Sequence, residues 1–251
     1  MCGRFGLIND LEEVAQQLEV FPPEQNNFAP NYNTSPGDYS PVITNQKPDL
    51  LQFFQFGLTP HWAKKRLYLF NARSEGDFNK DNNPNYQGVL GITQKPAFKK
   101  AIRSQRCLVP ANFFIEGPTK EKLNKPYVIY LTDRNKKPFC FAGLWDTWHD
   151  LEKNVLVNSF TIITTTPNAL LAQIPHHRSP VILPKVDEKK WLSNAPLEEI
   201  LPLLTPYSAQ HMQAYPIDPA IKNPKLNSRS LLKKIDNTLI EVKNDASQVK
   251  N

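Results

Sequence analysis

The chain has 251 residues, a formal net charge of +6, 40% hydrophobic residues and 10% aromatic residues. This composition excludes wholesale disorder and fits one large or two small globular domains. The sequence lacks an apolar run of the roughly 18 residues that span a bilayer, and its start lacks the apolar region of a secretory signal. We therefore expect neither a membrane protein nor a secreted one. The positive charge by itself favours polyanionic partners only weakly.

The first part of the sequence predicts one helix followed mainly by strands. Asp10 is a candidate N-cap with Glu13 three residues later, and apolar residues then recur at helical spacing as far as Leu18. Residues 21–48 are rich in Pro and Asn, which predicts an extended loop around one short strand at 41–44. Six further strands are predicted from β-branched and aromatic runs at 51–58, 106–109, 112–116, 127–132, 139–145 and 155–165.

Shorter helical patterns follow at 167–174, 187–192 and 197–204, with a strand at 180–183. Strands with helices between them favour an α+β fold with a curved or barrel-like, mostly antiparallel β core and short peripheral helices. A doubly wound nucleotide-binding fold is disfavoured, because the sequence has no βαβ alternation and no glycine-rich phosphate loop. We expect one domain over residues 1–232 and a flexible polar tail over 233–251.

Two basic clusters contain no acidic residue. One comprises Lys95, Lys99, Lys100, Arg103 and Arg106; the other comprises Lys64, Lys65, Arg66 and Arg73, with Trp62, Tyr68 and Phe70 interleaved. Basic residues beside exposed aromatic rings suit single-stranded nucleic acid, where charge holds phosphates and rings stack on bases. A solvated face above core aromatics is the alternative interpretation.

Cys2 directly follows the initiator methionine. Removal of Met1 would leave an α-amine and a thiol on one residue, with ordinary pKa values near 7.7–8.0 and 8.5, so both nucleophiles are partly available at neutral pH. Such an aminothiol can form an imine with an aldehyde and then close through sulfur to a thiazolidine. The alternative is that this position is incidental. Cys107 and Cys140 lie in predicted strands and are expected to be inert core thiols.

Three further polar residues are candidates for chemistry. Asn71 opens a compact polar cluster after the apolar run 67–70. Glu116 ends an apolar run, where burial would raise its pKa towards general acid–base use. His176 lies in a loop before the strand at 180–183, but the spacing to His177 is poor for a metal because adjacent side chains diverge. We therefore predict no metal site and no cofactor.

Eight short segments together resemble one known family. They are MCGRF at 1–5, NYNTSP at 31–36, FGLTPHW at 56–62, NARSE at 71–75, RCLVPA at 106–111, FAGLW at 141–145, SFTIITT at 159–165 and HHRSPVIL at 176–183. In this order they resemble the SRAP (SOS response-associated peptidase) family, whose members shield abasic sites in single-stranded DNA. The resemblance runs from residue 1 to about residue 230 and implies the SRAP fold.

The resemblance also implies a mechanism. Cys2, freed of Met1, would end as a thiazolidine crosslink to the ring-opened aldehyde of an abasic deoxyribose. Asn71 would orient the new N-terminus, Glu116 would shuttle protons, and His176 would assist sugar opening and release of the crosslink. These residues would also permit self-catalysed loss of Met1.

The implied partner is single-stranded DNA containing abasic sites. Arg4 and Arg73 would hold phosphates, Asn33, Trp62 and Arg178 would make further DNA contacts, and the two basic clusters would rim the channel. We expect a monomer with no membrane partner, cytoplasmic and nucleoid-associated in a bacterium or nuclear in a eukaryote. The sequence departs from the family's usual pattern at three positions, with Phe56 for Trp, Gly117 for Trp and Ser179 for Met.

Two other functions remain open at this point. One is an N-terminal-nucleophile cysteine peptidase or amidase that acts in trans through Cys2, with His176 and Glu116. The other is a nucleic-acid-binding module without chemistry, which Gly117 in place of the family's Trp would favour.

Overall fold

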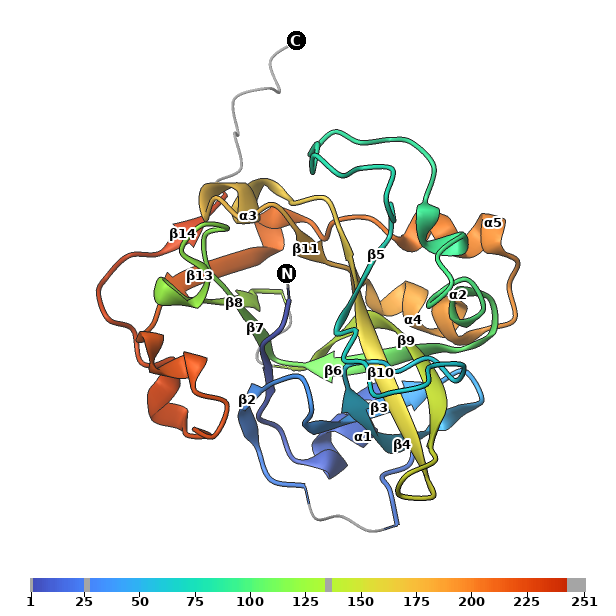
Figure 1. Ribbon diagram of the computed structural model, residues 1–251. Helices are drawn as coiled ribbons and strands as arrows, with labels where there is room; N and C mark the ends of the chain where they lie inside the picture. The colour runs from blue at the N-terminus through green and yellow to red at the C-terminus, as the bar shows by residue number, and fades with distance from the viewer. Residues whose placement is uncertain (1, 25–27, 134–136, 243–251) are drawn as a thin grey trace.

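The computed structural model describes residues 2–24, 28–133 and 137–242, and its strands form two sheets (Figure 1). The first sheet contains eight strands: β3 (Tyr39–Thr44), β4 (Lys47–Phe56), β5 (Asn71–Arg73), β6 (Arg106–Ala111), β9 (Phe139–Asp150), β10 (Val155–Thr165), β11 (Ser179–Pro180) and β12 (Ile182–Leu183). The second contains six, in the order β14 (Ile240–Glu241), β13 (Met212–Pro216), β8 (Tyr127–Leu131), β7 (Phe113–Glu116), β1 (Phe5–Leu7) and β2 (Asn31–Thr34).

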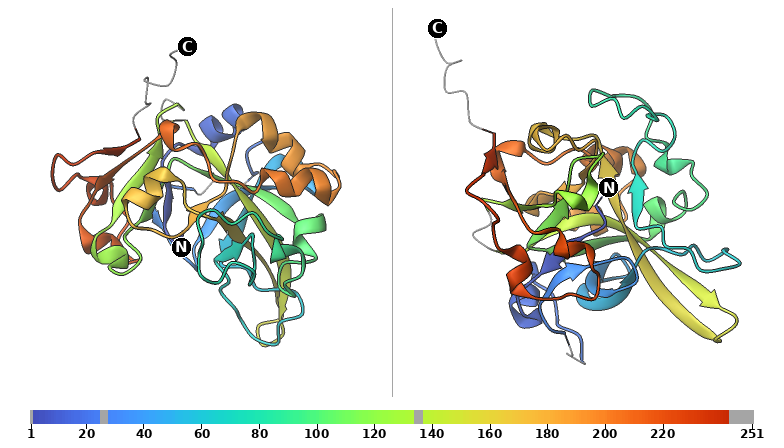
Figure 2. Two further views of the ribbon diagram at one scale, coloured as in Figure 1. Left: turned by 90° about the horizontal axis from the view of Figure 1, so that it is seen from above. Right: turned by 60° about the vertical axis from the view of Figure 1, so that its left-hand side comes forward.

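Five strands of the first sheet close into a barrel. Pairing runs from β4 through β3, β6 and β9 to β10, and β10 pairs with β4 again. Among the named strands of the described residues, β10 pairs in parallel with β4 and β5, and the other pairings are antiparallel. The α+β class and the barrel-like, mostly antiparallel core are therefore confirmed. The far end of the β9–β10 hairpin projects from the body of the molecule (Figure 2).

Five short α-helices surround the sheets: α1 (Leu11–Leu18), α2 (Ala101–Ser104), α3 (Ala169–Gln173), α4 (Lys185–Leu192) and α5 (Leu197–Ile200). At the start of α1 the Asp10 carboxylate accepts a hydrogen bond from the Glu13 amide at 2.8 Å, as the sequence predicts. The pattern at 197–204 divides into α5 and a 3₁₀ turn, Leu201–Leu203. Over the described ranges, no helix combines the length and the apolar character needed to cross a membrane.

Several elements differ from the sequence prediction. The loop expected over 21–48 contains β2 as well as β3. The strand expected at 180–183 is divided at Val181, because β11 pairs with β10 whereas β12 pairs with β9. The tail expected from residue 233 begins later, since Lys234 bridges to Ile217 and β14 pairs with β13. The remaining tail residues, 243–251, lie outside the described residues.

The core that positions the site lies between the two sheets. An aromatic cluster joins Phe5 and Phe114 of the six-stranded sheet to Phe56, Phe141 and Phe160 of the barrel, with neighbouring ring centroids 5.2–6.0 Å apart. Cys2 belongs to this cluster. Cys107 and Cys140 are buried free thiols in β6 and β9, as predicted.

Candidate functional site

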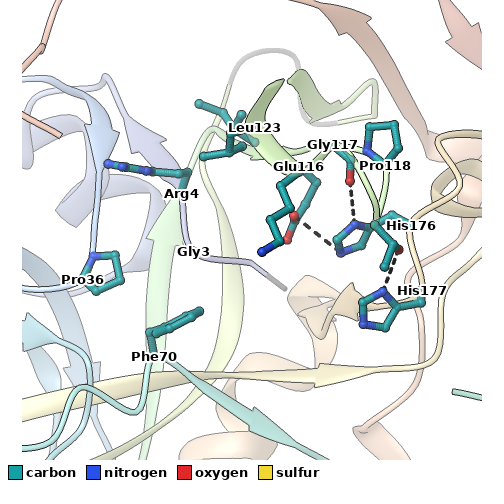
Figure 3. Close-up of a pocket in the computed structure, with 13 residues that line it drawn as sticks. Gly3, Arg4, Pro36, Phe70, Glu116, Gly117, Pro118, Leu123, His176 and His177 are labelled. Atoms are coloured by element: carbon teal, nitrogen blue, oxygen red, sulfur yellow. Dashed lines mark hydrogen bonds and ion pairs between the residues drawn. The ribbon is translucent and has the colours of Figure 1, made fainter. Parts of the chain in front are cut away.

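A cavity of about 410 Å³ opens beside the residues that lead into β1 (Figure 3). Its walls come from five places: the N-terminal segment, the connection between β2 and β3, the end of β7 with the loop that follows, the residue before β5, and the loop after α3. The lining residues are Gly3, Arg4, Pro36, Phe70, Ile115, Glu116, Gly117, Pro118, Thr119, Lys122, Leu123, His176 and His177. The fold thus brings predicted residues far apart in sequence to one concave site.

Glu116 and His176 face one another in this cavity. A Glu116 carboxylate oxygen, Oε2, lies 3.5 Å from His176 Nε2, and both side chains are at most 7% exposed. Burial raises the pKa of Glu116, and burial lowers the pKa of His176 to about 4. Each group is therefore driven towards its neutral form, in which Glu116 carries the shared proton and His176 Nε2 carries none.

The tautomer of His176 follows from its second nitrogen. His176 Nδ1 lies 2.8 Å from the Gly117 carbonyl oxygen, which can only accept a hydrogen bond. In the neutral ring Nδ1 therefore carries the proton, and Nε2 presents a lone pair to Glu116. The lone pair of Nε2 can accept a proton from the Glu116 carboxyl group, so the two side chains are arranged for proton transfer.

Gly117 is necessary for this geometry. A Cβ at this position would lie 1.8 Å from the Lys122 carbonyl oxygen and 2.7 Å from that of Lys125. The loop after β7 folds so tightly over Gly117 that a side chain cannot fit. The departure from the family's Trp is thus tied to a local backbone path that places the carbonyl which orients His176.

Cys2 lies beneath the cavity rather than on its wall. Its side chain is buried, with Sγ 4.0 Å from the Arg4 carbonyl oxygen. Burial raises the pKa of the Cys2 thiol well above its usual range, and the charge of Glu116 raises it further. Gly3, the next residue, does line the cavity. The thiol therefore lies within electrostatic reach of Glu116 and directly adjoins the site along the chain.

Asn71, the first residue of β5, holds the backbone at Cys2. Its Nδ2 donates to the carbonyl oxygens of Cys2 and Phe70, both at 3.0 Å. Its Oδ1 is buried without a hydrogen-bond partner among the described residues. Since β5 pairs in parallel with β10 in the barrel, this side chain adds a hydrogen bond between the barrel sheet and the N-terminal segment.

The DNA-contact candidates separate into reachable and unreachable side chains. Arg4 lines the cavity and is half-buried, with Nη2 donating to the Lys222 carbonyl oxygen at 2.9 Å. Asn33 is 1% exposed, and its Nδ2 donates to the carbonyl oxygens of Asn223 and Leu226, both at 2.9 Å. Burial argues against the predicted DNA contact by Asn33, whose hydrogen bonds instead anchor the segment before the last 3₁₀ turn.

Arg178 is also buried. Its guanidinium makes a two-pronged contact with Glu75 at 3.0 and 2.7 Å, and both side chains are at most 2% exposed. Burial tends to raise the pKa of Glu75, but the hydrogen bonds and charge of Arg178 hold it below its usual value. Burial argues against the predicted DNA contact by Arg178, because its guanidinium is paired with Glu75 inside the fold. Arg73 is half-buried, and its Nη2 donates to the Asn79 carbonyl oxygen at 2.6 Å.

The two basic clusters do not surround this cavity. Arg106 is 1% exposed and donates to the carbonyl oxygens of Trp191 and Ile102 at 2.7 and 2.8 Å, so it cannot rim a DNA channel. Trp62 is 53% exposed in the connection between β4 and β5. The stretch 64–66 lines a different cavity, against the β9–β10 hairpin. The described lining of the Cys2-side cavity contains no basic residue of either cluster, although Phe70, an aromatic residue interleaved in the second, is part of it.

Two lining residues carry chemistry that the sequence did not single out. His177 Nδ1 lies 2.7 Å from Thr119 Oγ1, and the imidazole ring centroids of His177 and His176 are 5.2 Å apart. Burial, with the neighbouring His176, lowers the pKa of His177 to about 4. The paired histidines were visible in the sequence, but only the fold places both at one wall. Within the described part of the chain, no three His, Cys, Asp or Glu side chains are grouped to hold a metal ion.

The chain is similar to named proteins over nearly its whole length. The abasic site processing protein YoqW of Bacillus subtilis is 35% identical over 241 residues, covering 92% of this chain and 99% of that protein. The abasic site processing protein HMCES of Xenopus tropicalis is 25% identical over 239 residues, covering 82% of this chain and 66% of that protein.

The fold has a similar solved counterpart. A crystal structure of a Bacteroides thetaiotaomicron protein superposes with a TM-score of 0.77 at 27% identity, covering 93% of this chain and 99% of that one. The family model described as SOS response associated peptidase (SRAP) matches residues 1–224. The chain belongs to the SRAP family.

Proposed function

We propose that this protein processes abasic sites in single-stranded DNA by a covalent crosslink through Cys2 after loss of Met1. One observation carries the proposal: Asn71 holds the Cys2 carbonyl at 3.0 Å beside a cavity in which Glu116 and His176 face each other at 3.5 Å. The names of the relatives support the processing of abasic sites in general. Formation of a thiazolidine with an aldehyde requires an aminothiol, groups that transfer protons, and a concave site that admits the aldehyde.

The proposed reaction joins the aldehyde to both nucleophiles of Cys2. The α-amine adds to C1′ of the ring-opened deoxyribose, and the carbinolamine loses water to give an imine. The thiol then adds across the carbon–nitrogen double bond, its proton passes to nitrogen, and a five-membered thiazolidine results. One water molecule is released overall, and no oxidant or reductant is needed.

Glu116 and His176 supply the proton transfers. A carboxyl group whose pKa is raised by burial can protonate the departing carbinolamine hydroxyl and later accept the thiol proton. His176 Nε2, facing Glu116, stores or returns that proton while Nδ1 remains bonded to Gly117. The same pair can protonate ring nitrogen or sulfur in the reverse direction, which would release the crosslink.

DNA binding would use few side chains. Arg4, on the cavity wall, and Arg73 would contact phosphates next to the lesion, and exposed Trp62 would stack on a base. Arg178 and Asn33 act inside the protein in this proposal. Phosphate contacts without base-edge contacts predict little sequence preference. We further propose a monomer that resides where the cell keeps its DNA.

A denaturing gel tests the proposal directly. Protein is incubated with a single-stranded oligonucleotide containing one abasic site and then heated in denaturant. We expect a heat-stable adduct, and none with Cys2→Ala. Cys2→Ser keeps the amine but not the sulfur, so its adduct should survive only after borohydride reduction of the imine. Cys107→Ala, at a buried thiol outside the cavity, is the matched control and should crosslink normally.

Intact mass measures the required processing of the N-terminus. The purified protein should be lighter than the printed sequence by one methionine residue. If Cys2→Ala, Glu116→Gln and His176→Asn also lack Met1, another enzyme removes the methionine and the site itself does not. A heat-stable adduct that persists unchanged in Cys2→Ala, or in protein that keeps Met1, would overturn the proposal.

The hydrolase alternative makes a different prediction. A peptidase or amidase acting in trans would turn over peptide substrates repeatedly, whereas the proposed protein cleaves at most its own Met1 bond.

A further inference from the structure

A second cavity, of about 480 Å³, lies at the other end of the β7–β8 hairpin. It is lined from the start of β7, from β8 and from β13, whereas the Cys2-side cavity uses the end of β7 and the loop that follows. No residue lines both cavities. The two sites can therefore be occupied at the same time.

The cavity exists because the outer face of the six-stranded sheet is only partly covered. Outward side chains of β7 and β8 pack under Ile217, Ile221 and Leu231, which belong to the C-terminal segment with its 3₁₀ turns Pro219–Lys222 and Arg229–Leu232. This segment lies against the sheet at one side (Figure 2). Beyond its edge, other apolar side chains of the same face form the floor of the cavity.

The floor is aromatic, and one of its two tyrosine hydroxyls is already hydrogen-bonded. Tyr130 and Tyr215 form an edge-to-face pair with centroids 5.9 Å apart, and the Tyr130 hydroxyl donates to Gln213 Oε1 at 2.6 Å. Lys234 Nζ lies 5.0 Å from the centroid of the Tyr215 ring. Phe113 completes the floor. Such a surface suits an inserted apolar side chain better than a flat base, because one ring face is covered by a cation and the rings meet edge to face.

The rim is positive. Lys137 and Arg229 line the cavity and are exposed, and neither has a hydrogen bond or an ion pair with any described residue. Acidic side chains are absent from the described lining. Glu241 is outside this lining but lies near it on the same face of the sheet, where its carboxylate accepts from Gln213 Nε2 at 2.8 Å. Two unpaired cations therefore flank an apolar hollow.

We infer that this cavity is a docking site for an acidic peptide segment of a partner protein, with one large apolar side chain as its anchor. The anchor fills the hollow over Phe113, Tyr130 and Tyr215, while carboxylates of the segment pair with Lys137 and Arg229. Residues 243–251 of this chain do not match that chemistry, since they contain two lysines, one aspartate and no aromatic residue. The two rim cations, with Lys234 at the floor, are also too few to follow a nucleic-acid backbone, which carries a phosphate at every nucleotide.

Fluorescence anisotropy with the full-length protein tests the inference. The probe is a fluorescein-labelled peptide, Asp-Asp-Asp-Asp-Phe, in low-salt buffer. Two control peptides remove one feature each: Asp-Asp-Asp-Asp-Ala lacks the anchor, and Asn-Asn-Asn-Asn-Phe lacks the charge. We expect saturable binding of the first peptide and at least about fivefold weaker binding of both controls.

Charge reversal at the rim locates the binding. Arg229→Glu and Lys137→Glu should each weaken the probe about fivefold or more, whereas Lys225→Glu, an exposed cation of the same segment that does not line the cavity, should leave it unchanged. All three variants should crosslink abasic DNA like the unaltered protein, because they lie outside the Cys2-side cavity. The docking test therefore does not depend on the outcome of the crosslinking test.

Three results would overturn the inference. The first is the absence of saturable binding to the acidic probe. The second is that Lys225→Glu weakens binding of the probe as much as Arg229→Glu and Lys137→Glu do. The third is that a labelled oligothymidine binds more tightly than the peptide and that Arg229→Glu lowers its affinity. The last result would assign the cavity to nucleic acid.

Discussion

At residue scale, burial acts on Glu116 and His176 with opposite consequences for their pKa values and the same consequence for their charge. Both are pushed towards neutrality, Glu116 by a raised pKa and His176 by a lowered one. A pair of neutral groups within 3.5 Å can exchange a proton without creating an isolated buried charge. This property suits the successive protonation and deprotonation that imine formation and ring closure require.

The lowered pKa of His176 predicts a pH dependence of stability. Between pH 6.5 and its folded value of about 4, the unfolded chain binds a proton at His176 that the folded chain does not. The free energy of unfolding therefore falls as the pH falls through this window, by up to about 3 kcal/mol from this residue. His176→Asn keeps a donor towards Gly117 and removes the titration. In urea unfolding, the free energy of unfolding of the variant should rise relative to that of the unaltered protein as the pH is lowered from 6.5 to 4. A difference between the two free energies that stays constant with pH would contradict the assignment.

Asn71 is expected to act on rate rather than on DNA affinity. Asn71→Ala removes the hydrogen bond to the Cys2 carbonyl, which is a loss of roughly 0.5–1.5 kcal/mol of positioning energy. Single-turnover crosslinking should slow by about 2- to 13-fold, while binding to the same oligonucleotide without an abasic site is unchanged. Asn168→Ala is the matched control, since it removes a half-buried amide side chain that caps α3 and does not line the cavity. Equal slowing by both variants would reduce the role of Asn71 to general stability.

At the scale of elements, the pair Arg178–Glu75 joins the loop before β11 to the turn after β5. Arg178→Met leaves the Glu75 carboxylate buried without its cation, and such a loss costs about 3–5 kcal/mol. Chemical denaturation should show this drop, and Arg178→Met with Glu75→Gln should recover much of it. Lys189→Met, which breaks an exposed pair with Glu19, should leave the stability nearly unchanged, because solvent screens that pair. Unchanged stability together with weaker DNA binding by Arg178→Met would restore Arg178 as a phosphate contact.

The elements that sequence patterns predict best are those with long uniform runs. The alternation and β-branched content of 155–165 predict β10 with its observed ends, and Asp10 with Glu13 marks the start of α1. Strands such as β1 and β5 have three residues each, too few for a periodicity to register. Their existence depends on partners far along the chain, as β5 depends on β10.

The site was predictable in composition but not in geometry. Cys2, Asn71, Glu116 and His176 could be named from motifs, yet the bonds that relate them cross 60 to 70 residues of chain. Arginines were the least predictable residues, because a sequence does not distinguish a guanidinium that faces solvent from one that is paired inside. Arg106 and Arg178 are both in the second group.

At the scale of the whole molecule, a closed barrel and an open six-stranded sheet share one aromatic core, and each supplies part of the Cys2-side cavity. The barrel contributes Asn71 through β5, while the open sheet contributes Glu116 through β7. Because the two halves of the site come from different sheets, docking of the sheets is a precondition for chemistry. The open sheet is also the part whose edge is completed last along the chain, by β14.

Truncation from the C-terminus tests that dependence. Removing residues 243–251 leaves β14 and its pairing with β13 intact, so the melting temperature should stay within about 2 °C of the full chain. Removing 233–251 takes away β14, the bridge from Lys234 to Ile217, and the partly buried Ile240 and Val242. At roughly 1 kcal/mol for each half-buried side chain, the loss is about 2 kcal/mol, or about 4–8 °C in melting temperature. Differential scanning calorimetry measures both changes. Equal melting temperatures for the two truncated chains would mean that the polar segment from residue 233 contributes nothing to the fold.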